Sequence, residues 1–110
     1  MATTYKILGQ LAPTTTSNGN LYTVPASTST IVSTLVIANT TATAATTRVF
    51  ARIAAATEAT SNAVLYDVSI PANSSSAFTL GMTLATTDKI TVQTGTANAL
   101  TFTAFGSEIS

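Results

Sequence analysis

The chain has 110 residues, of which 45% are hydrophobic and 7% are charged, and its four basic and four acidic side chains give a net charge of zero. About 25% charged residues is typical of globular proteins, and so few basic side chains cannot neutralise many phosphates. Nucleic acid and anionic membrane surfaces are therefore excluded as partners. The length is that of one domain, so residues 1–110 are predicted to form a single unit with one core.

Cysteine is absent, which predicts a fold without disulfides or thiolate chemistry. The N-terminal MATTYKILGQ lacks the basic region and long apolar run of a signal peptide, and no stretch approaches the roughly 18 apolar residues of a membrane span. We therefore expect synthesis in a cytoplasm. The low charge protects poorly against association, which favours a molecule that packs among other copies or other proteins. The alternative is a soluble domain hydrated by its many hydroxyl groups.

Short segments rich in Thr, Val, Ile, Tyr and Phe run through the chain, separated by turn-forming clusters such as APTTTSNGN and PANSSS. These segments predict eight strands, at residues 4–9, 21–24, 29–39, 46–54, 63–70, 78–84, 89–94 and 99–105. Residues 51–63 contain an alanine run without helical periodicity, so we expect a loop there with at most one helical turn.

Alternation within each segment predicts which side chains face the core. In the first segment, Tyr5 and Ile7 share one face and Lys6 takes the other. The segment 29–39 is apolar on both sides, as in a central strand, with Ile31, Leu35 and Ile37 on one face and Val32 and Val36 on the other. In the later segments the residues expected on the core side are Val49, Ala51, Ile53, Val64, Tyr66, Val68, Ile70, Phe78, Leu80, Met82, Leu84, Ile90, Val92, Leu100 and Phe102. Phe105 is out of phase with the last pair, so it points outward unless a bulge near Gly106 resets the alternation.

Short strands separated by frequent turn signals are typical of an antiparallel sandwich or a small barrel. Short links such as residues 86–88 and 95–98 favour hairpins. We predict an all-β fold, an antiparallel β-sandwich of about eight strands that is Ig-like or jelly-roll-like. Threonine, with its branched Cβ, suits the faces that do not enter the core.

The titratable residues give little support for catalysis. Histidine and cysteine are absent, which removes the common nucleophile–base pairs and most zinc sites. The four acidic residues, Glu58, Asp67, Asp88 and Glu108, are spread along the chain, and we expect them to act as solvated caps and turn formers, with Asp88 in a tight turn. A pair of them acting as acid and base is the alternative. We therefore expect no enzymatic activity, no cofactor, no metal and no small-molecule substrate.

One segment carries a candidate binding patch. Arg48, Phe50 and Arg52 alternate along a predicted strand and should lie side by side on its outward face. Arginine and aromatic residues are enriched at protein interfaces, so these three residues are the predicted partner-binding site. The alternative is an ordinary exposed face on which the arginine stems cover Phe50. Threonine rows of the ice-binding kind need a regular repeat, which this sequence lacks.

Three long segments resemble a known family: ATTYKILGQLAPTTTSNGNLYTVPAST, STLVIANTTATAATTRVFARI and ANSSSAFTLGMTLATTDKITVQTGTANALTFTAFGSEI. They are similar to small virion structural proteins of tailed bacteriophages, notably those that infect cyanobacteria and marine bacteria. The most recognisable pieces are YKILGQ, LYTVPA, LGMTLATTDKITV and FGSEI. The resemblance implies a β-rich particle component without catalytic residues.

Together with the composition, this resemblance leads to the hypothesis of a capsid decoration (cement) protein. Such a protein would bind the outside of the shell formed by the major capsid protein, as a homotrimer near local three-fold positions, and would stabilise the assembled shell. It would be made in the host cytoplasm and located on the capsid surface of the virion. The alternatives are a tail or fibre component that contacts the host surface, and a stand-alone carbohydrate-binding sandwich.

Overall fold

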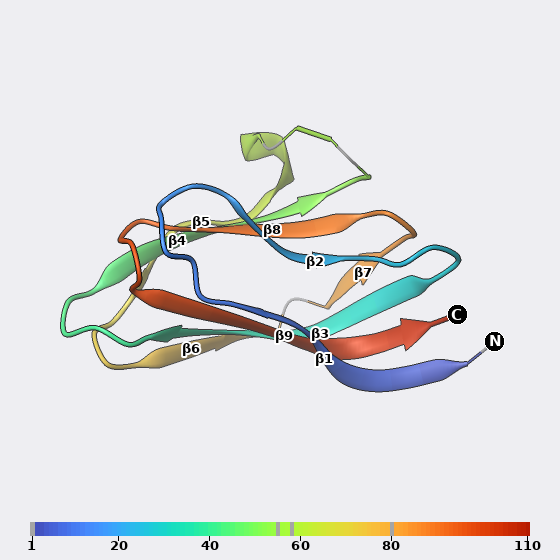
Figure 1. The fold of residues 1–110 in the computed structure, drawn as a ribbon, viewed down its shortest axis with the longest axis horizontal. Helices are drawn as coiled ribbons and strands as arrows, with labels where there is room; N and C mark the ends of the chain where they lie inside the picture. The colour runs from blue at the N-terminus through green and yellow to red at the C-terminus, as the bar shows by residue number, and fades with distance from the viewer. Residues whose placement is uncertain (1, 55, 58, 80) are drawn as a thin grey trace.

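Strands dominate the part of the chain that the computed structural model describes, residues 2–54, 56–57, 59–79 and 81–110 (Figure 1). They are β1 (Thr3–Leu11), β2 (Gly19–Thr23), β3 (Ser29–Asn39), β4 (Ala45–Arg52), β5 (Ala63–Ile70), β6 (Ser75–Phe78), β7 (Met82–Leu84), β8 (Lys89–Thr94) and β9 (Leu100–Ile109). A single 3₁₀ turn among these residues, η1 (Thr60–Asn62), is the helical turn that the sequence allowed within residues 51–63. No helix in the described ranges is long and apolar enough to span a bilayer.

The strands form two antiparallel sheets packed face to face, which confirms the predicted all-β sandwich. Sheet A has the order β1-β9-β3-β6, with β7 also paired to β3, and sheet B has the order β2-β8-β4-β5. Strand β9 pairs with β1 on one side and with β3 on the other. The last strand is therefore central to sheet A, and the two chain ends lie side by side, where Ala2 and Ser110 exchange two backbone hydrogen bonds of 2.9 Å.

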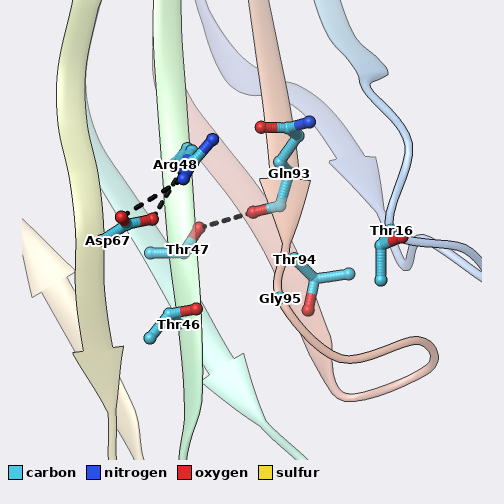
Figure 2. A pocket seen from close by; sticks show the side chains of 8 residues that line it. All are labelled: Thr16, Thr46, Thr47, Arg48, Asp67, Gln93, Thr94 and Gly95. Carbon is cyan, nitrogen blue, oxygen red and sulfur yellow. Dashed lines mark hydrogen bonds and ion pairs between the residues drawn. The ribbon is translucent and has the colours of Figure 1, made fainter.

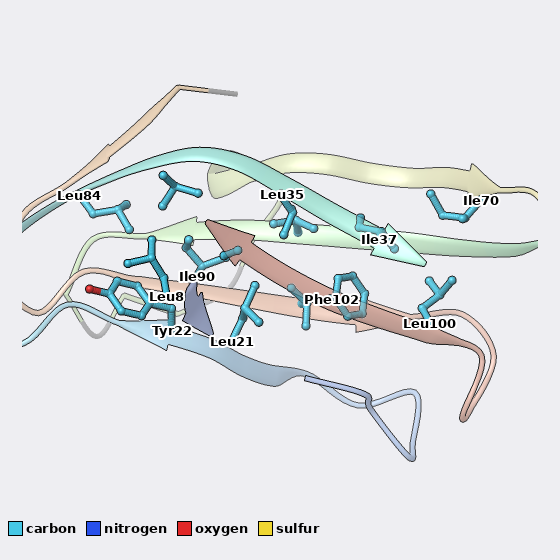
Figure 3. Close-up of a cluster of buried hydrophobic side chains, with 14 of the residues drawn as sticks. Leu8, Leu21, Tyr22, Leu35, Ile37, Ile70, Leu84, Ile90, Leu100 and Phe102 are labelled. Atoms are coloured by element: carbon cyan, nitrogen blue, oxygen red, sulfur yellow. The ribbon is translucent and has the colours of Figure 1, made fainter. Parts of the chain in front are cut away.

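The core fills the space between the two sheets (Figure 3). Leu35, Ile37 and Phe102 of sheet A have no exposed surface, and they share one cluster with Ile90 and Val92 of sheet B, which are equally buried. Burying side chains of this size stabilises the fold by about 1.5–3 kcal/mol each. The inward positions predicted for strands β8 and β9 are thus confirmed.

The first half of β3 faces the opposite way from the prediction. Val32 is 1% exposed and belongs to the core, whereas Ile31 is 41% exposed on the outer face of sheet A. The pairing of β3 with β9 shifts register between Val32 and Thr34, which marks a β-bulge at Ser33. Because the bulge adds one residue, it reverses the alternation, so Ile31 and Leu35 lie on opposite faces.

Strand β5 differs from the prediction for the same reason. Val64 and Tyr66, expected in the core, are 39% and 47% exposed, and Leu65 packs against the core in their place. Between the pairs Thr47–Val68 and Val49–Leu65, β5 advances by three residues while β4 advances by two. Asp67 provides the extra residue in a left-handed conformation with a φ of 53°, which Asp adopts more readily than most residues.

Two further expectations change in detail, and the outward position predicted for Phe105 is confirmed. Ile53, predicted to face the core, is 78% exposed because β4 ends at Arg52. The predicted strand 78–84 is two strands, β6 and β7, on either side of Gly81, whose φ is 61°; Leu80 lies outside the described residues. Phe105 points outward and is 36% exposed. The extra residues lie on the neighbouring strands β1 and β3, beside Phe105, and not on β9 itself.

Candidate binding face

The predicted binding residues lie on β4, a central strand of sheet B. The pairing of β4 with β8 has no register shift from residue 47 to residue 52, and Val49 is fully buried in the core. Alternation therefore places Arg48, Phe50 and Arg52 together on the outer face of sheet B, as the sequence predicted. We call this surface, with the neighbouring Tyr66, Asp67 and Gln93, the Arg48 face.

Phe50 is nevertheless not exposed on this surface. Its exposed fraction is 5%, although it does not belong to the core between the sheets. Ala59 and Thr60, at the start of η1, line the same hollow as Phe50 and Arg48. The Nε of Arg52 donates a hydrogen bond of 2.6 Å to the carbonyl oxygen of Ala56 and so holds this loop against the sheet. Phe50 thus anchors a small second apolar contact beneath the loop.

Arg48 is the centre of a three-residue cluster. Its Nε and a terminal nitrogen donate to the two carboxylate oxygens of Asp67, at 2.6 and 3.2 Å, in a bidentate pair. Its guanidinium carbon lies 4.2 Å from the centre of the Tyr66 ring, a cation–π contact. Hydrogen bonding from Arg48 lowers the pKa of the Asp67 carboxyl, and the same bonds raise the pKa of Arg48. Both groups therefore stay charged over the ordinary pH range.

The bulge on β5 makes this cluster possible. In a regular strand Tyr66 and Asp67 would point to opposite faces. The left-handed conformation of Asp67 and the register shift beside it bring both side chains to the outer face, where Arg48 meets them. The side chains of Arg48 and Asp67 remain 37% and 50% exposed, so a partner can reach them.

Two shallow hollows flank Arg48. One of about 170 Å³ is lined by Arg48, Asp67 and Gln93, and by Thr16, Thr46, Thr47, Thr94 and Gly95 (Figure 2). Its floor is fixed by the hydroxyl of Thr47, which donates a hydrogen bond of 3.1 Å to the carbonyl oxygen of Gln93. The other hollow, of about 260 Å³, is lined by Arg48, Gln93 and Tyr66 and by Asn18, Phe50, Ala59 and Thr60. Guanidinium, amide and hydroxyl groups thus offer hydrogen bonds beside one aromatic ring.

The described acidic residues all make structural contacts. Asp88 accepts hydrogen bonds from the backbone N–H groups of Ala54 and Ala85, at 3.0 and 2.9 Å, which confirms its predicted place in a turn. Asp67 pairs with Arg48, and Glu108 pairs with Lys6 at 3.1 Å. Glu58 lies outside the described residues. Within the described residues, no three potential metal ligands of the His, Cys, Asp and Glu types come together.

The fold and this face define a β-sandwich protein with a hydrogen-bonding outer surface on one sheet. No family model matches the chain, and no curated protein is significantly similar to it. A chain in a structure of infectious bursal disease virus, Gx strain, superposes with a TM-score of 0.53 at 14% sequence identity, over 97% of this chain and 31% of the viral chain. This protein therefore spans about a third of that chain's length, and the similarity shows a shared fold.

Proposed function

We propose that this protein is a non-enzymatic structural component of a bacteriophage virion, a capsid decoration protein that binds the outside of the major capsid shell. The observation that carries the proposal is the fold shared by nearly the whole chain with a chain in a virus structure. The bacteriophage sequence resemblance supports the same assignment. Binding to the assembled shell, and not to its free subunits, would stabilise the assembled state by mass action.

The Arg48 face is the proposed contact with the capsid shell. Arg48 uses only part of its five N–H donors on Asp67, so the remainder can bind carbonyl or carboxylate groups of a capsid subunit. The bidentate pair and the stacking on Tyr66 hold the guanidinium in place, which lowers the entropic cost of ordering it on binding. The predicted arrangement as trimers near local three-fold positions stays a prediction.

Reconstitution on capsids tests this function. Shells that lack this protein should bind it at saturating levels of hundreds of copies, and the coated shells should withstand heating better than bare shells. Arg48→Ala should lose most of this binding, whereas Lys89→Ala, which removes one positive charge near Arg52 on the same strand pair, should keep it. If the wild-type protein does not bind shells, the proposed function is wrong. If Arg48→Ala binds as well as the wild type, the Arg48 face is not the docking face.

The second hollow favours one other candidate function. Asn18, Arg48 and Gln93 beside the half-exposed ring of Tyr66 resemble the mixed polar and aromatic lining of sugar sites. A tail or fibre module that contacts host-surface glycans would use such a lining. The number of copies in each particle distinguishes the two functions, because a tail part is present about a dozen times and a shell-covering protein hundreds of times. Glycan binding without capsid binding would favour the tail component.

A further inference from the structure

Strand β1 leaves one side of sheet A open. It is the outermost strand of the sheet, and its pairing with β9 is regular from Thr3 to Ile7. Ala2 and Ser110 exchange two backbone hydrogen bonds. In an antiparallel ladder, hydrogen-bonded pairs alternate with pairs that are not hydrogen-bonded, so Thr4 and Lys6 are the next residues of β1 that bond to β9. The backbone N–H and C=O groups of Thr3, Tyr5 and Ile7 therefore point away from β9, toward the open side. We call Thr3–Ile7 the Tyr5 edge.

The side chains beside this edge form an exposed apolar patch. Tyr5 and Ile7 are 83% and 51% exposed, and they line a hollow of about 520 Å³ together with Ile31 and Phe105, which are 41% and 36% exposed. These four side chains expose roughly 400 Å² of apolar surface, which is within the range of patches that mark binding sites. The patch lies on the outer face of sheet A, so it faces away from the Arg48 face on sheet B.

The usual protection against edge pairing is weak here. Prolines, bulges and charged side chains, lysine in particular, normally discourage strand addition. The segment Thr3–Ile7 contains no proline and no register shift, and its only charge, Lys6, is neutralised by Glu108 at 3.1 Å. Strand β1 has a register shift only after Ile7, whereas shifts leave shorter regular stretches in the other outer strands β2 and β5, and β6 and β7 have four and three residues. The Tyr5 edge is thus the longest regular open edge in the described residues.

We propose that the Tyr5 edge pairs with the same edge of a second copy of this chain, antiparallel and around a two-fold axis at Tyr5. In that register Tyr5 lies opposite Tyr5 of the second copy, and Thr3 lies opposite Ile7. The three residues whose backbone groups are free on each copy then satisfy one another completely, with about six hydrogen bonds, two per opposed pair. Both apolar patches come to the same face of one continuous sheet, where the two Tyr5 rings are direct neighbours.

The chemistry of the edge favours a second copy as its partner. The residues with free backbone groups, Thr3, Tyr5 and Ile7, are spaced symmetrically about Tyr5. A second copy running in the opposite direction therefore presents its donors and acceptors at the matching positions. The net charge of zero gives no repulsion between copies. Edge pairing covers the open backbone groups and mainly the side chains of Tyr5 and Ile7, much less than the roughly 800 Å² that each partner contributes to a standard interface, so we expect a reversible dimer with a Kd on the order of 10–100 µM. This pairing closes with two copies, which distinguishes it from the trimer predicted with the decoration role.

Sedimentation of the pure protein tests the proposal without any capsid. From about 1 µM to 1 mM the wild-type protein should change from monomer to dimer. Tyr5→Lys and Tyr5→Glu should each stay monomeric, since like charges would lie directly opposite. An equimolar mixture of the two variants should form the dimer again. Ile53→Glu, at a 78% exposed site outside this edge, should dimerise like the wild type.

Amide hydrogen exchange gives a second readout with residue resolution. On raising the concentration, the amides of Thr3, Tyr5 and Ile7 should become protected, whereas those of Thr4 and Lys6, already bonded to β9, should change little. A monomer at about 1 mM, a trimer, or dimerisation that is unaffected in both Tyr5 variants would overturn the proposal. Because these outcomes concern the pure protein, they leave the test of capsid binding independent.

Discussion

The hydroxyl group of Tyr22 donates a hydrogen bond to the Glu108 carboxylate, and so connects β2 of sheet B to β9 of sheet A across 86 positions of sequence. The phenol has one proton, so the buried Thr30 hydroxyl, 2.8 Å away, donates to the Tyr22 oxygen. Lys6 binds the other carboxylate oxygen. These four residues form a polar link between the two sheets.

Replacing Tyr22 with Phe should lower the free energy of unfolding by about 1.5–3 kcal/mol, because a hydrogen bond to a charged group is lost and the hydroxyl of Thr30 loses its partner. Urea denaturation measures the change. The matched control is Tyr66→Phe, since Tyr66 is 47% exposed and a hydroxyl at such a surface contributes within about 0.5 kcal/mol. Equal stability of the two variants would show that the link between the sheets contributes nothing.

The same link should make stability depend on pH at the acid end. The hydrogen bond from Tyr22, followed by the contacts of Lys6, lowers the pKa of the Glu108 carboxyl. A carboxyl with a lowered pKa stabilises the folded state above its unfolded-state pKa, and this contribution is lost as the pH falls through the folded-state value. We expect the free energy of unfolding to decrease below about pH 4, and Glu108→Gln to flatten that decrease in urea titrations.

At the alkaline end Tyr22 itself should control stability. Burial, followed by the hydrogen bond to Glu108, raises the pKa of Tyr22 to about 12. The folded state therefore favours the protonated phenol, and its contribution is complete below about pH 10 and is lost as the pH rises toward 12. The loss should be on the order of 2 kcal/mol. Unfolding measured from pH 9 to 12 should show it in the wild type and not in Tyr22→Phe.

Substitutions at Phe50 and at Arg48 should distinguish a loss of stability from a loss of binding. From the sequence alone, replacing Phe50 and both flanking arginines with Ser is expected to abolish particle binding and leave the fold intact. Phe50 is only 5% exposed, so Phe50→Ser should cost about 3–5 kcal/mol of stability. Arg48→Ser removes a surface ion pair, which contributes little, and should change stability far less than Phe50→Ser. Thermal unfolding compares the variants, and an unchanged Phe50→Ser would contradict its role beneath the loop.

The sequence predicts the fold best where strands pair without interruption. Ile90 and Val92 lie on β8, whose register with β4 is continuous, and their inward positions follow from simple alternation. The inward positions that alternation predicts for Ile31 and Tyr66 are wrong, because a bulge lies two residues after Ile31 and another lies directly beside Tyr66. A bulge is fixed by the partner strand, which is distant in sequence, so a local pattern of apolar residues does not reveal it.

The candidate site was predictable in part for the same reason. Alternation places Arg48 and Arg52 on an outward face, as the structure does, but the burial of Phe50 depends on the nearby loop. Alternation does not predict Asp67 and Tyr66 as neighbours of Arg48. One signal was present, since Asp is depleted in strands and tolerates the left-handed conformation, and Asp67 interrupts the β-forming run AVLYDVSI.

Gly106 lies where the backbones of two central strands, β3 and β9, approach each other closely. A Cβ at this position would lie 1.9 Å from the carbonyl oxygen of Ile31 and 3.0 Å from the Cα of Val32, both of which belong to the backbone of β3. Glycine to alanine usually stabilises a strand by up to about 1 kcal/mol. Here the substitution must separate β3 from β9 beside the bulge at Ser33, so we expect a loss of at least about 3 kcal/mol.

Gly19→Ala is the matched control for this prediction. A Cβ at Gly19 would also be too close to an atom, at 2.6 Å, but that atom is the terminal Cδ2 of the Leu11 side chain, which can rotate away. This variant should therefore change the free energy of unfolding by less than about 1 kcal/mol. Urea denaturation of both variants gives the comparison. If Gly106→Ala were as stable as Gly19→Ala, β3 and β9 would be able to separate freely at this point, and the packing of sheet A around β9 would not be rigid there.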